Sequence, residues 1–270
     1  MTKYIGIIVL LFSFNSCIEE IDGLSNTPEE LVLHCYISPS DTLISAVLSR
    51  ATSFAMNEIK FNDLFVKDAH ITMSDGNLEK QLVLNPKNNF YEFKVSNDFK
   101  IEKGKTYSIK AVAKDGKVLT SSCTVPLKSI KQEEIEVEKS FRGSDFVDIR
   151  LKWPSNRTSF YVLRPYFYYS GIRSKNLPTS HTIQFFSGAD IESDKITSNY
   201  FTNDLINNQR RNIVFLYVAD ENFYTYSKST ELNSNNQDDP FAQPVNAKHN
   251  INGGFGCFGA YYTIRLDLDF

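Results

Sequence analysis

Between residues 31 and 125 the chain alternates hydrophobic and polar residues in short runs that are separated by turn-forming residues. The first run, LVLHCYI (31–37), puts its odd-numbered residues on one face of a strand. LISAVLSR, AHITM, QLVL, FYEFKV, TYSIKAVA and VLTSSCTV continue the pattern. Alternation with a period of two is typical of half-buried strands. Seven such strands, with turn signals between them, predict an immunoglobulin-like β-sandwich over residues 31–126.

The last hairpin of this region determines where Cys123 points. A two-residue turn at Asp115-Gly116 would direct Cys123 to the polar face, so we expect a longer loop with a bulge, which turns Cys123 inward. Cys35 also points inward, and the first and last strands of such sandwiches commonly lie together. Two alternatives stay open: a Cys35–Cys123 disulfide, or two buried free thiols.

Residues 127–270 predict a larger, β-rich C-terminal domain. Its charged start, LKSIKQEEIEVEKS (127–140), is either a linker or the first strand of this domain. DFVDIRLKW, FYVLRPYFYY, HTIQFF and NIVFLYV continue the β-like pattern. The segment 219–232 breaks it: Asp220 is a suitable N-cap and Glu221 suits a first turn, which together predict one substantial helix. A polar loop (233–250) and a glycine-rich terminal strand follow.

The N-terminus carries a short apolar run, IGIIVLLFSF (5–14), after Lys3. Spanning a bilayer takes ~20 apolar residues, so this run fits the apolar region of a secretory signal instead. Ser16-Cys17 resembles a bacterial lipobox, which predicts a signal peptide over residues 1–16 and acylation of Cys17. An uncleaved anchor is the alternative. Two or more acyl chains would hold the mature chain stably on a membrane.

Acidic residues follow the cysteine at once. Glu19, Glu20 and Asp22 lie in a predicted tether, residues 17–30, and resemble the acidic export signal of Bacteroidota lipoproteins on the outer face of the outer membrane. We therefore expect a surface-exposed protein. The alternative is a plain solvated tether, because glycine, serine, asparagine and proline follow.

Composition narrows the range of partners. Lys and Arg total 29 against 32 Asp and Glu, the net charge is −3, and no basic stripe is present, so nucleic acid is not an expected partner. Three cysteines remain after Cys17, namely Cys35, Cys123 and Cys257. An odd number in an oxidising compartment predicts at most one disulfide, with Cys257 unpaired.

Several segments occur together in a recognisable order: LVLHCYISPSDTLISAVLSR, KTYSIKAVAKDGKVLTSSCTVP, FTNDLINNQ, DPFAQPVN and INGGFGCFGAY. With the leader and Cys17, they resemble, over nearly the whole chain, the Bacteroidota lipoproteins grouped as domain of unknown function 4249. Members tend to be encoded beside TonB-dependent outer-membrane receptors. The resemblance implies an accessory or ligand-handling partner of such a receptor in nutrient uptake.

Motifs for chemistry are missing from the sequence. The histidines His34, His70, His181 and His249 show no ligand spacing, so neither a metal nor another cofactor is expected. His34 points away from the core-facing set, which predicts an exposed side chain. No nucleophile elbow, phosphate loop or dinucleotide fingerprint occurs, and we expect no enzyme. The alternatives are a free-standing adhesive or ligand-binding module, and a hydrolase whose residues are distant in sequence.

Two segments are candidates for a partner interface. Gly254 and Gly256 lie in INGGFGCFGAYY, where glycine permits close approach of a second backbone, either internal or from a partner. Tyr166, Tyr168 and Tyr261 supply the area and polar tips that interfaces favour. Core packing is the alternative for each ring.

A modification is the last candidate. Asp41-Thr42-Leu43 resembles the three-residue O-glycosylation site of exported Bacteroidota proteins, with Thr42 as the acceptor. An ordinary turn is the alternative, because three residues often match by chance.

Overall fold

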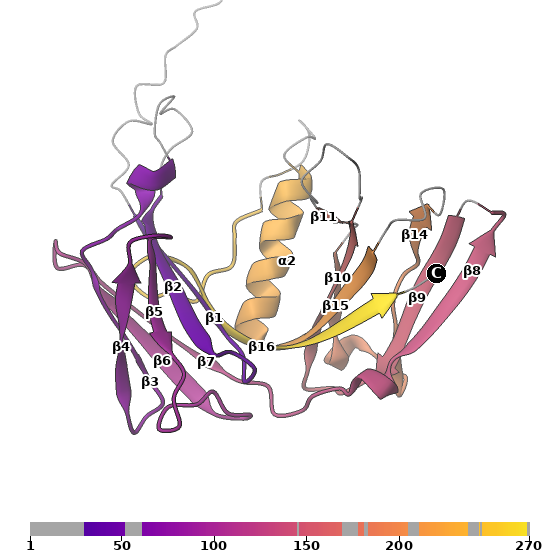
Figure 1. The fold of residues 1–270 in the computed structure, drawn as a ribbon, viewed down its shortest axis with the longest axis horizontal. Helices are drawn as coiled ribbons and strands as arrows, with labels where there is room; N and C mark the ends of the chain where they lie inside the picture. Colours follow the sequence, from indigo (N-terminus) through magenta and orange to yellow (C-terminus); the bar gives the residue numbers. More distant parts are fainter. Residues whose placement is uncertain are drawn as a thin grey trace, which may run out of the picture.

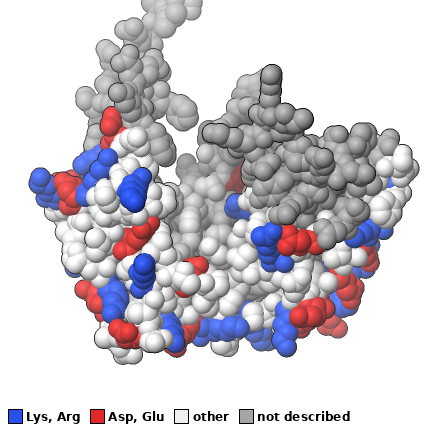
Figure 2. Space-filling model, in the orientation of Figure 1, with Lys and Arg blue, Asp and Glu red and all other residues white. Residues whose placement is uncertain are grey.

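The computed structural model describes residues 30–51, 61–144, 146–168, 178–180, 183–204, 211–236, 243 and 245–268. Among these residues it is mainly β, with one α-helix, α2 (Glu221–Asn236). The predicted fold class, a β-sandwich followed by a β-rich region that carries a helix, is confirmed. Figure 1 shows the sandwich at one end of the long axis, α2 in the middle and a small sheet at the other end. Basic and acidic side chains are interspersed on the face that Figure 2 shows.

The N-terminal half folds as predicted from the alternating pattern. Its strands are β1 (Leu31–Ile37), β2 (Leu43–Arg50), β3 (His70–Ser74), β4 (Glu79–Asn85), β5 (Phe90–Lys94), β6 (Thr106–Val112) and β7 (Val118–Thr124), with a short 3-10 turn, η2 (Phe61–Leu64). They are joined in the order β1-β2-β5-β4-β3-β6-β7. The first core collects their inward residues, including Leu33, Ile44, Tyr107 and Cys123.

The β6–β7 hairpin has the longer loop expected from the sequence. Tyr107 pairs with Cys123 and Val112 with Val118, and the backbone N–H of Ala113 donates to the carbonyl of Lys117. Three residues therefore form the loop, and the last, Gly116, has a φ of +86°, as a bulge requires. Cys123 points inward, as predicted, and is 3% exposed.

The second half is built on two sheets. Its elements are η3 (Gln132–Glu134), β8 (Glu136–Arg142), β9 (Phe146–Pro154), β10 (Phe160–Tyr168), β11 (Pro178–Ser180), β12 (Gln184–Ser187), η4 (Gly188–Asp190), β13 (Lys195–Thr197), β14 (Phe201–Asp204), β15 (Arg211–Ala219) and β16 (Phe255–Leu268). β8, β9, β13 and β14 form the small sheet, whose inner face packs with β10, β15 and β16 around Trp153 in a second core. The charged stretch 127–140 thus contains a strand as well as a linker.

β16 joins the two halves, which a boundary at residues 126–127 did not anticipate. Its first part runs parallel to β1, with Val32 opposite Phe255 and Ile37 opposite Ala260. Its second part pairs antiparallel with β15, from Tyr261 to Leu268. Phe258 and Ala260 therefore belong to the first core, although they lie in the predicted C-terminal domain. Figure 1 shows this yellow strand running from the sandwich into the second half.

Helix α2 begins where the sequence predicts. The Asp220 carboxylate accepts a hydrogen bond from the Phe223 backbone N–H at 2.9 Å, which is the N-cap interaction. The helix then lies over β16, β10 and β15 and buries Phe223 and Tyr224 in a third, smaller apolar cluster. Because α2 covers this face of the sheet, His34 and Tyr36, which alternate outward from β1, are half-buried against it.

Candidate functional site

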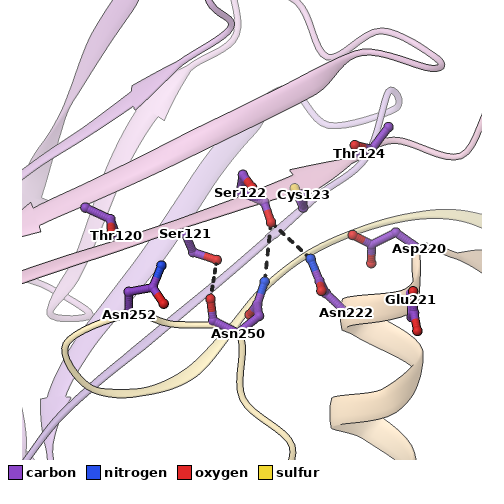
Figure 3. A pocket seen from close by; sticks show the side chains of 10 residues that line it. All are labelled: Thr120, Ser121, Ser122, Cys123, Thr124, Asp220, Glu221, Asn222, Asn250 and Asn252. Carbon is purple, nitrogen blue, oxygen red and sulfur yellow. Dashed lines mark hydrogen bonds between the residues drawn. The ribbon is translucent and has the colours of Figure 1, made fainter.

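A polar groove of about 670 Å³ lies between β7, the start of α2 and the segment that precedes β16 (Figure 3). Its lining carries hydroxyls, carboxamides and two carboxylates, and no lysine, arginine or histidine: Thr120, Ser121, Ser122, Cys123, Thr124, Asp220, Glu221, Asn222, Asn250 and Asn252. Three segments that are distant in sequence meet here. Such a surface suits a neutral polar or positively charged group.

Two asparagine side chains close the gap between β7 and β16. Nδ2 of Asn250 donates to the Phe258 carbonyl at 2.8 Å, and Oδ1 of Asn250 accepts from the Phe258 N–H at 2.9 Å. The Asn222 amide donates to the Ser122 carbonyl at 3.0 Å (Figure 3). These carboxamides therefore satisfy backbone groups of Ser122 and Phe258 with side-chain hydrogen bonds.

Backbone contacts complete the junction at one end of the groove. Thr120 and Asn252 exchange both N–H···O hydrogen bonds, at 3.1 and 2.9 Å. The Ser121 hydroxyl donates to the Asn250 carbonyl at 2.8 Å (Figure 3). The floor of the groove is therefore held rigidly, which favours a preformed site.

Asp220 is a strongly perturbed carboxyl group in the groove. One carboxylate oxygen, Oδ1, caps α2. The other, Oδ2, is buried, and no described residue meets normal hydrogen-bond geometry with it. Burial raises the pKa of Asp220 to about 7, although hydrogen bonds with backbone groups of Phe223, Ala260 and Thr124 act in the opposite direction. This carboxyl group therefore titrates near neutral pH.

A second hollow, of about 420 Å³, lies on the other side of Asp220 and Glu221. Apolar side chains contribute more to it, among them Val125, Pro126 and Phe160. Leu127, also in its lining, is 71% exposed. The start of α2 thus separates a polar groove from a more apolar one.

The three cysteines of the described body are buried free thiols. Of the two alternatives for Cys35 and Cys123, the structure has the thiols and not the disulfide. The reason is topological: β16 lies beside β1, and its approach segment bridges to β7, so the terminal chain occupies the place where the first and last strands would have met. Burial raises the pKa of Cys35, Cys123 and Cys257, which keeps each thiol protonated and weakly reactive.

The expectation of an exposed His34 is wrong. Its Nε2 lies 2.6 Å from the hydroxyl oxygen of Tyr226 on α2, and the two rings meet edge to face with centroids 5.4 Å apart. Burial lowers the pKa of His34. The side chain does point away from the first core, but the helix covers that side of the strand.

Internal packing accounts for the two candidate interface glycines. A Cβ added to Gly256 would lie 2.1 Å from the Leu33 carbonyl oxygen, and one added to Gly254 would lie 2.4 Å from that of Leu31. Gly256 also has a φ of +110°. The close approach that glycine permits is therefore between β16 and β1 of the same chain, and a partner backbone is not needed to explain it.

The candidate tyrosines lie on or near the face that carries α2. Tyr261 is half-buried, with its ring centroid 5.1 Å from Phe223 and 5.4 Å from Tyr217. Tyr166 is also half-buried, against Phe215 at 5.5 Å. The backbone of Tyr168 pairs with Pro178 and Arg211, and its side chain lies outside the described residues. A chain of ring contacts through Phe215 and Tyr217 thus links Tyr166 to Tyr261.

Thr42 is exposed in the turn between β1 and β2, and the Asp41 carboxylate accepts a hydrogen bond from the Ser38 N–H at 2.7 Å. Cys17, Glu19, Glu20 and Asp22 lie outside the described residues.

Within the described ranges, no three His, Cys, Asp or Glu side chains lie close enough together to hold a metal ion. The same part of the chain includes no helix that is long and apolar enough to cross a membrane.

The fold and the groove define a β-sandwich protein with an open polar site beside the start of a helix. The chain matches the family described as Domain of unknown function (DUF4249) over residues 18–265, and it belongs to this family. No curated protein matches it.

Solved structures give distant likenesses. The FN1–FN3 domains of chicken CNTN1 are 10% identical over 90% of this chain and 67% of that one, with a TM-score of 0.31. A two-domain fibronectin type III segment of chicken tenascin is 14% identical, covering 71% and 91%, with a TM-score of 0.22. A DUF3823 family protein from Parabacteroides merdae is 10% identical, covering 72% and 92%, with a TM-score of 0.20.

Proposed function

We propose that this protein is a lipid-anchored protein of the outer membrane, exposed on the cell surface, that handles ligand beside a TonB-dependent receptor. One observation carries the proposal: an apolar leader ends at Ser16-Cys17, and Glu19, Glu20 and Asp22 follow directly. The described body starts at Glu30, so residues 17–29 are left to connect it with the lipid. The receptor as partner rests on the family resemblance.

The anchor has a direct test. Metabolic labelling with a fatty-acid analogue should tag the wild-type protein and leave Cys17→Ala unlabelled. The variant should be released from the membrane or keep its leader. Equal labelling of both proteins would show that Cys17 is not the site of acylation.

Surface display is tested separately. Protease added to whole cells should degrade the body, and survival until the cells are broken would place it in the periplasm. Replacing Glu19, Glu20 and Asp22 with alanine should retain the acyl chains and reduce display, because the export signal depends on that charge. Unchanged display would assign these residues to a plain tether.

Binding, as opposed to catalysis, is supported by the site itself. The groove is open and polar, its asparagines are engaged with backbone groups, and its one cysteine is a buried thiol with a raised pKa. Ser122→Trp would place a ring in the groove and keep the Ser122 carbonyl that Asn222 contacts. It should weaken receptor copurification or ligand uptake. Lys114→Trp, in the exposed turn of the same hairpin, is the matched control.

A free-standing ligand-binding module is the second candidate, and the same groove favours it. In that case the purified protein binds a polar ligand without any receptor, and Ser122→Trp abolishes this binding. If receptor-dependent uptake is unchanged by Ser122→Trp, the functional contact lies outside the groove. Tyr166, half-buried near the surface of β10, is then the next candidate.

A further inference from the structure

Two exposed phenylalanines mark the end of the β8–β9 hairpin. Phe141, near the end of β8, is 61% exposed, and Phe146, at the start of β9, is 41% exposed. Both flank the turn that contains Gly143, which has a φ of +66°. Two large apolar side chains are thus exposed to solvent at one turn.

The strand register puts the two rings on opposite faces of the hairpin. Arg142 pairs directly with Phe146, and its guanidinium lies 5.8 Å from that ring, so the two share a face. Phe141 precedes Arg142 in the same strand and therefore points to the other face. A flat protein surface laid against one face would cover one ring. A medium that surrounds the end of the hairpin covers both.

The hairpin end and the start of the body lie at the same edge of the molecule. Figure 1 shows β8 ending at the upper edge, at one end of the long axis. β1 starts at that edge at the other end of the axis, where Leu31 pairs with Arg50 and Glu30 bonds to Ala51. The chain that carries the predicted lipid site, Cys17, joins the described body at Glu30, and therefore at this edge.

We propose that the end of the β8–β9 hairpin, through Phe141 and Phe146, is a second contact of the body with the lipid surface. This inference rests on the proposed lipid anchor at Cys17. Aromatic rings are favoured at the boundary between headgroups and acyl chains. Arg142, between the two rings in sequence, is ion-paired with Asp148, so the contact lies at headgroup depth. Two contacts at the two ends of the long axis fix how the body stands on the membrane.

This orientation directs the groove away from the membrane. Figure 1 shows α2 starting on the side opposite the start of β1, and residues at this start of α2 line the groove. A ligand or partner would therefore reach the groove without displacing lipid.

A fluorescent label measures the contact. The acylated protein carrying Ser144→Cys is labelled with an environment-sensitive dye and bound to phosphatidylethanolamine–phosphatidylglycerol vesicles that contain brominated lipid. Cys35, Cys123 and Cys257 are buried and do not compete for the dye. The matched label is at Asn77→Cys, an exposed turn position. Successive antiparallel pairings from β1 through β2, β5, β4 and β3 place that turn at the opposite end of the sandwich.

We expect brominated lipid to quench the Ser144→Cys label and to leave the Asn77→Cys label unquenched. Phe141→Ser with Phe146→Ser should abolish this quenching, whereas Val83→Ser, which removes an exposed side chain of the sandwich, should not. Unquenched dye at Ser144→Cys on vesicle-bound protein would overturn the inference. A dye at Ser144→Cys that is already shielded from solvent without vesicles would also overturn the inference, since a second copy of the protein would then cover the hairpin. Protein that is not acylated, and therefore not vesicle-bound, would instead contradict the anchor.

Discussion

Nε2 of His34 lies 2.6 Å from the hydroxyl oxygen of Tyr226, and this contact ties the first strand of the sandwich to helix α2. Burial lowers the pKa of His34 from its usual 6.5, so the unfolded chain binds a proton more readily than the folded chain. The contribution of His34 to the unfolding free energy is therefore present above pH 6.5. It is lost as the pH falls from 6.5 toward the lower pKa of the folded state.

Substitution of His34 should remove this dependence. His34→Gln should remove the rise in unfolding free energy that His34 contributes between about pH 5 and pH 8, and should leave the opposite contribution of Asp220 in place. Tyr226→Phe should cost about 1 kcal/mol at neutral pH and keep the dependence, because the imidazole stays buried. Urea unfolding at several pH values measures both variants. A His34→Gln slope equal to that of the wild type would assign the titration to another group.

Asp220 should act in the opposite direction. Its pKa is raised by burial from 3.8 to about 7, so stability is fully present below pH 3.8 and falls as the pH rises toward 7. Asp220→Asn keeps an N-cap acceptor without a charge, and it should exceed the wild type by about 1 kcal/mol or more near pH 8 and match it near pH 4.

Asp220→Ala serves as the control for the cap. It should lose about 1 kcal/mol at low pH, where the wild-type carboxyl is neutral but still caps the helix. A stability loss for Asp220→Asn at pH 8 would mean that the ionised carboxylate stabilises the start of α2.

Gly256→Ala tests whether this glycine serves the fold. The added methyl would meet the Leu33 carbonyl at 2.1 Å and the backbone φ is +110°, so we expect a loss of at least about 3 kcal/mol in unfolding free energy. Gly76→Ala has a φ of +93° but open space around it, and should cost about 1–2 kcal/mol. If Gly256→Ala is nearly as stable as the wild type and loses only partner binding, this glycine belongs to a partner interface and not to the fold.

Asn250 should be the key polar side chain of the junction. Asn250→Ala removes the hydrogen bonds of its side chain to the Phe258 N–H and carbonyl, and leaves the carbonyl only the longer bond from Asn222 at 3.5 Å, so we expect a loss of about 2 kcal/mol. Asn252→Ala is the matched control, since Asn252 meets Thr120 through its backbone. Thermal unfolding distinguishes the two. Equal effects of both substitutions would contradict the role given to Asn250.

Local patterns were sufficient for much of the fold. Alternation predicted the seven strands of the sandwich, and Asp220 was recognised as an N-cap. A loop longer than two residues, with a bulge, was predicted to turn Cys123 inward. Each of these depends on residues that are near one another in sequence, where period and turn geometry determine the outcome.

Contacts between distant segments were not predictable in this way. Leu33 and Gly256 are neighbours because β16 runs parallel to β1, and His34 is enclosed because α2 crosses the same strands. Asn250 lies in a polar segment that looked like a loop, and its hydrogen bonds to Phe258 leave no periodic signal. The groove forms only where β7, the start of α2 and the segment before β16 meet, which is why the sequence did not reveal it.

Copurification from gently solubilised membranes tests the proposed function most directly. Tagged wild-type protein should bring down a TonB-dependent receptor, and Cys17→Ala, which cannot reach the same membrane face, should not. The melting temperatures of the wild type and of Cys17→Ala should agree, because the substitution lies outside the folded body. Wild-type protein that is acylated, displayed on the surface and nevertheless isolated alone would contradict the account.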